Sequence, residues 1–180
     1  MVSFAFLLLP VCLVWYCFYL KKARITPAII IGVIASVLLS LFLAVFTFSH
    51  RIPPYNFAKN FIYLSLTQTV LPSVILFLLY AIISRDDLSV KAEAFFPLEL
   101  SFFSIYLPYI IITTSDGRYN FFQIFIKPVL FLVMIFLASF SIKKISVYFI
   151  SKKIVVAVLF IILFFISLLI PPLFETIYIM

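Results

Sequence analysis

Residues 26–48, TPAIIIGVIASVLLSLFLAVFTF, are the stretch that decides the fold class of this 180-residue chain. The stretch contains no charged residue, and basic residues flank it on both sides, with Lys21, Lys22 and Arg24 before it and Arg51 after it. The hydrocarbon core of a bilayer is about 30 Å thick, so a helix needs roughly 20 apolar residues to cross it. The stretch therefore predicts a transmembrane helix.

The composition extends this prediction to the whole chain. Hydrophobic residues make up 67% of the sequence, charged residues 11%, and the mean hydropathy is +1.34, whereas about a quarter of the residues in soluble domains are charged. The net charge is +7, but the basic residues form short clusters between apolar runs, which is typical of membrane flanks. We therefore expect the lipid bilayer as the main partner, and no nucleic acid.

Six apolar runs are long enough to cross a bilayer, and short polar segments separate them. We predict an all-α integral membrane protein, a six-transmembrane-helix bundle in one domain (1–180), with spans at approximately 2–20, 26–48, 57–84, 94–114, 120–142 and 154–170. Prolines interrupt several of these helices, which membrane helices tolerate where neighbours or water satisfy the freed carbonyls.

The prolines also shape the expected ends of the spans. We expect a kink or tilt at Pro72 and a short tail after Pro171-Pro172. We place Pro97 in the first turn of the fourth span, with Glu99 facing the positive end of the helix dipole. The segment between Lys143 and Lys153 either lies on the inner leaflet or continues the fifth span.

The distribution of basic residues predicts the orientation. Alternate loops carry nine Lys and Arg residues on one side and three on the other. The positive-inside rule places the nine in the cytoplasm. The protein is then a multi-pass protein of the cytoplasmic (inner) membrane, with both termini outward.

Small residues recur at every fourth position of the second span. Such a stripe lets another helix approach closely. It indicates either packing inside the protein or a docking face for a membrane-protein partner or a second copy of the chain; the residues are Ala28, Gly32, Ser36, Ser40 and Ala44.

Polar residues recur at helical spacing near the outward ends of the third, fourth and fifth spans. At about 100° per residue each set shares one helix face. The faces predict a small outward-facing polar cluster that binds a solute; its candidate residues are Asn56, Asn60, Tyr63, Thr67, Gln68, Tyr109, Thr113, Asn120, Gln123 and Lys127. The alternative is that these side chains bond headgroups or neighbouring helices.

Lys127 is the deepest charge of this cluster, eight residues beyond Tyr119. Eight residues at a rise of about 1.5 Å place its Cα on the order of 12 Å past the preceding turn. Its side chain either snorkels back to the interface or reaches water or an acidic partner. Asp116 and Glu175 lie on the same side of the membrane and are the candidate partners.

No catalytic or metal-binding motif stands out. The sequence has one histidine and none of the phosphate-loop, zinc-protease or nucleophile-elbow motifs, and Cys12 and Cys17 lack metal spacing. We expect no cofactor, no metal and no enzymatic activity. The sequence favours a non-catalytic, transport-related or solute-binding membrane subunit; the alternatives are a structural or assembly subunit of a membrane complex and an intramembrane lipid-modifying enzyme.

Overall fold

The computed structural model describes residues 2–20, 26–47, 56–83, 88–114 and 120–179, and nearly all of them are helical. The prediction of an all-α fold is confirmed. In chain order the elements are α1 (Val2–Leu20), α2 (Thr26–Thr47), α3 (Phe57–Leu64), the π-helical segment η2 (Ser65–Val70), α4 (Leu71–Ile83), α5 (Leu88–Thr114), the π-helical segment η3 (Phe122–Ile126), α6 (Lys127–Ile150) and α7 (Ile154–Ile179).

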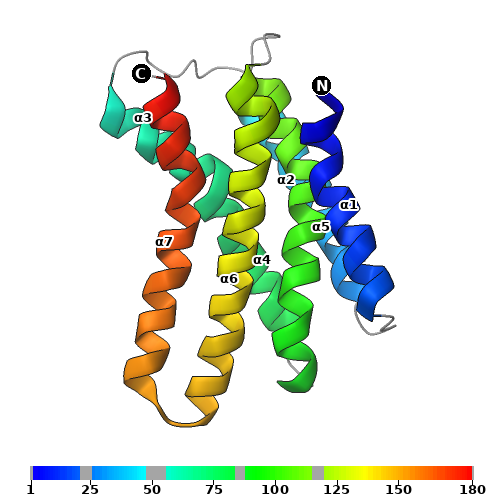
Figure 1. The fold of residues 1–180 in the computed structure, drawn as a ribbon, viewed down its shortest axis with the longest axis vertical. Helices are drawn as coiled ribbons and strands as arrows, with labels where there is room; N and C mark the ends of the chain where they lie inside the picture. Colours follow the sequence, from blue (N-terminus) through cyan, green and yellow to red (C-terminus); the bar gives the residue numbers. More distant parts are fainter. Residues whose placement is uncertain (1, 21–25, 48–55, 84–87, 115–119, 180) are drawn as a thin grey trace.

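The helices pack side by side as an elongated bundle (Figure 1). Within the described ranges, five helical stretches are long and apolar enough to cross a membrane: Thr26–Val45, Phe57–Ile82, Ala94–Thr113, Phe122–Phe149 and Ile154–Tyr178. The apolar part of α1, Phe4–Phe18, is shorter. A multi-pass membrane protein is therefore supported, while the count of six spans remains a prediction.

Two helix boundaries differ from those expected at the prolines, and a third settles an open alternative. α5 begins at Leu88, so Pro97 lies inside the helix and the prediction that it occupies the first turn was wrong. α7 runs through Pro171-Pro172 to Ile179, so no separate tail follows these prolines. α6 continues to Ile150, so the segment after Lys143 continues the fifth predicted span and does not lie separately on the inner leaflet.

The tight turn between α6 and α7 makes these two helices antiparallel neighbours (Figure 1). The amide of Ser151 donates to the carbonyl of Val147, and Lys152 has a φ of 56°. Lys127 lies 25 residues before Lys152, and Glu175 lies 23 residues after it. Because both helices rise equally per residue, the turn brings these two residues to similar depth, near the end of the bundle where α1 begins and α7 ends (Figure 1). We call this end the terminal end.

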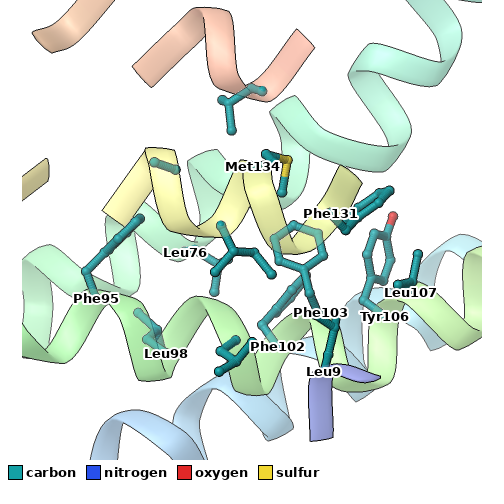
Figure 2. Packing of buried hydrophobic residues seen from close by; sticks show 14 of the residues in the cluster. Leu9, Leu76, Phe95, Leu98, Phe102, Phe103, Tyr106, Leu107, Phe131 and Met134 are labelled. Carbon is teal, nitrogen blue, oxygen red and sulfur yellow. The ribbon is translucent and has the colours of Figure 1, made fainter. Parts of the chain in front are cut away.

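α5 is the central helix of the bundle, and it packs against α1, α2, α4 and α6. Its side chains meet those of neighbouring helices in a closely packed apolar core (Figure 2). The core includes Leu9, Leu76, Phe95, Leu98, Phe102, Phe103, Tyr106, Leu107, Phe131 and Met134. By contrast, α2 and α7 expose many large apolar side chains, which suits helices that face lipid.

Candidate functional site

A buried ion pair joins α6 to α7 near the terminal end. The ammonium Nζ of Lys127 lies 2.7 Å from Oε1 of Glu175, and the two side chains are only 1% and 4% exposed. Of the two interpretations of Lys127, the structure favours an acidic partner over snorkelling, because the ammonium ends on a buried carboxylate. Asp116, the other candidate partner, lies outside the described residues.

The second carboxylate oxygen of Glu175 is also buried, and it has no hydrogen-bond partner among the described residues. α7 packs against α6, η2 and α3. These two neighbours of α7 carry two buried amide side chains, Gln68 on η2 and Asn60 on α3. Both amide atoms of Gln68 and Oδ1 of Asn60 likewise have no partner within the described chain. Buried polar groups are normally paired, so this set has hydrogen-bonding capacity left for water or a solute.

Both π-helical segments stand immediately before an X-Pro pair. η2 is followed by Leu71-Pro72, and η3 is followed by Lys127-Pro128. The amide of Leu71 donates to the carbonyl of Leu66, and that of Lys127 donates to the carbonyl of Phe122, five residues back in each case. π-bulges of this kind are frequent at functional sites, and here Lys127 is the residue that caps the C-terminal end of η3.

In a π-helix each carbonyl accepts from the N–H five residues later. For Thr67 that residue is Pro72, which has no N–H, so the Thr67 carbonyl is left without a backbone donor. The hydroxyl of Tyr106 donates to this carbonyl at 2.6 Å. Figure 2 shows the Tyr106 ring in the core beside Leu107. Tyr106 of α5 therefore supplies the hydrogen bond that Pro72 cannot give to the helical stretch α3–η2–α4.

The ten predicted binding residues fall into three groups by exposure. Asn60, Gln68 and Lys127 are buried; Tyr63, Thr67, Tyr109 and Gln123 are half-buried; Asn56, Thr113 and Asn120 are exposed. The continuous helical faces assumed from a period of 3.6 residues do not persist. Each π-helical turn adds a residue and rotates the following side chains relative to α-helical spacing, so Lys127 is buried although Asn120 is exposed.

Several of the predicted residues have local hydrogen bonds. Oδ1 of Asn56 accepts from the amide of Lys59 at 3.1 Å and caps α3. Oε1 of Gln123 accepts from the amide of Asn120 at 3.3 Å. The hydroxyls of Thr67 and Thr113 donate to carbonyls one turn earlier in their own helices. These contacts stabilise helix ends and turns. We take as the candidate site the three buried residues of the ten, Asn60, Gln68 and Lys127, together with the buried Glu175.

The small-residue stripe of α2 meets α5 inside the protein. Ala28, Gly32 and Ser36 are buried, whereas Ser40 and Ala44 are half-buried. A Cβ added to Gly32 would lie 2.6 Å from the carbonyl oxygen of Leu98 and would also meet Oγ of Ser101. The close approach of α5 therefore accounts for the first three residues of the stripe, and a partner at α2 stays a prediction.

Glu175 is the site residue that the list of ten omits. The proline pair before it predicts the end of a span, which would place Glu175 in a tail. Lys152 and Lys153 mark a polar turn between the last two apolar runs. Counting residues outward from this turn along two antiparallel helices would have placed Glu175 opposite Lys127. Within the described residues, no three His, Cys, Asp or Glu side chains gather as a metal site would require.

Comparison of the chain with protein-family models, with curated proteins and with solved structures gave no match.

Proposed function

We propose that this chain is a non-catalytic, transport-related membrane subunit that binds a small polar solute at the Lys127–Glu175 pair. The observation that carries the proposal is this pair, buried between two apolar helices with unpartnered polar atoms on the helices around it. The chain lies in the cytoplasmic membrane with both termini outward, so the site is near the outer face.

The energetics of the pair support a role beyond stability. Taking two charges out of water opposes their attraction, and replacing a buried pair by apolar residues of similar volume is often neutral or stabilising. Ionisable residues within membrane spans are therefore functional candidates by default. Because α7 is otherwise rich in apolar residues, helix packing alone does not require a glutamate at position 175.

The chemistry of the pair suggests the class of solute. A solute with a carboxylate or phosphate can take the place of Glu175 beside the Lys127 ammonium. The amides of Asn60 and Gln68 offer both donors and acceptors to the polar remainder of such a molecule. We therefore propose a small solute that carries one anionic group and several hydrogen-bonding groups.

Native mass spectrometry of the protein released from its own membranes tests the proposal. We expect a bound small molecule on the wild-type chain and none on the variant Lys127→Met/Glu175→Met, while Asn120→Ala, a change at an exposed position, keeps it. A stoichiometric protein partner with no small molecule would instead indicate an assembly subunit.

A further inference from the structure

Glu99 is a second buried acid, and it lies apart from the candidate solute site. Its side chain is 0% exposed in the middle of α5. Its Oε2 accepts a 3.0 Å hydrogen bond from the hydroxyl of Ser139 on α6. Ser139 follows Lys127 by 12 residues on α6, which is about 18 Å along the helix axis. Glu99 therefore belongs to a different level of the bundle.

Glu99 differs from Glu175 because no positive charge balances it among the residues that the structure describes. Where the chain is described, no Lys, Arg or His forms an ion pair with Glu99, and its buried Oε1 has no hydrogen-bond partner. A carboxylate without a counter-charge is strongly disfavoured in an apolar, water-free environment, whereas a neutral carboxyl is tolerated far better.

The other titratable groups on the helices around α5 have positions of their own. Lys127 is bound to Glu175, Lys143 is exposed, and the ammonium of Lys144 lies over the Phe140 ring. Tyr80 of α4 packs edge-on against Phe95, and Tyr16 of α1 packs against Phe96. α1 also carries Cys12, Cys17 and Tyr19, α5 itself carries Lys91, Glu93, Tyr106 and Tyr109, and Tyr148 is on α6, whereas α2 contributes no titratable group within Thr26–Thr47.

Two ligands are chemically possible at Oε1 of Glu99, a proton or a metal cation. A metal ion such as Ca²⁺ or Mg²⁺ needs about six oxygen ligands. Ser139 is the one side chain that hydrogen-bonds Glu99 among the described residues, and its hydroxyl points its hydrogen, not its lone pairs, at the carboxyl. No cluster of acidic or metal-ligating side chains accompanies Glu99 in these ranges. The surroundings suit a proton.

We propose that Glu99 is a proton-binding site inside the membrane. An O–H bond forms between Oε1 and a proton delivered by water, and the charge of the carboxyl changes from −1 to 0, while Oε2 keeps the hydrogen bond from Ser139. This proposal is independent of the solute site.

Infrared spectroscopy of the full-length protein in phosphatidylcholine bilayers tests this assignment directly. The chain has only three glutamates, Glu93, Glu99 and Glu175, so labelling glutamate with a ¹³C carboxyl group gives a simple spectrum. Near neutral pH we expect the carbonyl stretch of a protonated carboxylic acid in the wild type. The band should vanish in Glu99→Gln and persist in the matched control Glu93→Gln. Absence of an acid band in the wild type, or a band that survives Glu99→Gln, would overturn the proposal.

A second variant covers the case in which Glu99→Gln does not fold. Ser139→Ala keeps the carboxyl but removes the hydrogen bond to Oε2, so the acid band should move to higher frequency. An unmoved band in Ser139→Ala would show that the protonated acid is not Glu99 and would reject the assignment. If Glu99→Gln does fold, we expect its unfolding temperature to stay within a few degrees of the wild type, since the amide is uncharged like the protonated acid.

Discussion

The hydroxyl of Tyr106 on α5 donates a 2.6 Å hydrogen bond to the carbonyl of Thr67, the carbonyl that Pro72 leaves without a backbone donor in the π-helical register. The bond joins the central helix α5 to η2, the π-helical segment between α3 and α4. It explains how the bundle tolerates Pro72 inside the long apolar stretch Phe57–Ile82, since a side chain of another helix satisfies the freed backbone group.

Tyr106→Phe should therefore lower the free energy of unfolding by about 1 kcal/mol, the usual net worth of one hydrogen bond. Pro72→Ala restores an N–H at position 72, so the same Tyr106→Phe change should have a smaller effect in that background. Unfolding in mixed detergent micelles measures this double-mutant cycle. Tyr109→Phe is the matched control, and equal losses with and without Pro72 would contradict the explanation.

Gly32 should tolerate no larger side chain. Gly32→Ala places a methyl group against the Leu98 carbonyl, and overpacking of this kind costs about 1–3 kcal/mol in soluble cores. Val37→Leu also adds one carbon, but at a position that is 42% exposed, so it should change the unfolding free energy little. Similar results for the two variants would mean that α2 and α5 are not in close contact at Gly32.

The positions of the long apolar helices were predictable from the sequence because hydropathy reports directly on burial in lipid. The ends of these helices near prolines were not predictable, because a proline ends a helix only where nothing satisfies the carbonyl groups that it leaves unpaired. Pro171 and Pro172 therefore lie inside α7. The same limit applies to the site, since the sequence pattern gives no sign of the two π-helical segments. Gln68 is buried within η2, and Lys127 is buried directly after η3 while Asn120 stays exposed.

The orientation of the chain gives a further prediction. A reporter that works only outside the cytoplasm should be active when it is fused after Met180 and inactive when it is inserted within 86–92. The physical reason is the excess of Lys and Arg in the loops assigned to the cytoplasm, nine against three. The reverse activities would place the Lys127–Glu175 pair near the cytoplasmic face and contradict an outward-opening site.

A substitution at Gln68 tests whether its side chain binds the solute or packs the helices together. Its two amide atoms have no partner in the described part of the chain, so Gln68→Leu removes an unsatisfied buried group and should leave the protein equally stable or more stable. The same change should weaken solute binding at least tenfold if the amide contacts the solute. A large loss of stability on thermal unfolding would show instead that the amide holds the helices together.

Single changes in the ion pair should be much more harmful than the double change. Lys127→Met leaves Glu175 as an unpaired buried charge, and breaking a buried pair in this way costs about 3–5 kcal/mol. Glu175→Met does the same to Lys127. Lys127→Arg keeps the charge but not the compact geometry of the ammonium, so it should preserve more stability than Lys127→Met. Equal stability of Lys127→Met and the wild type would argue against the pair.

The most direct measurement for the solute-binding proposal is the melting temperature of Lys127→Met/Glu175→Met, taken with and without the small molecule that copurifies with the wild type. Because two apolar residues of similar size replace a desolvated pair, we predict a protein at least as stable as the wild type whose melting temperature no longer rises when the molecule is added. A double variant that still responds to the molecule, or one that is much less stable than the wild type, would contradict a functional role for the Lys127–Glu175 pair.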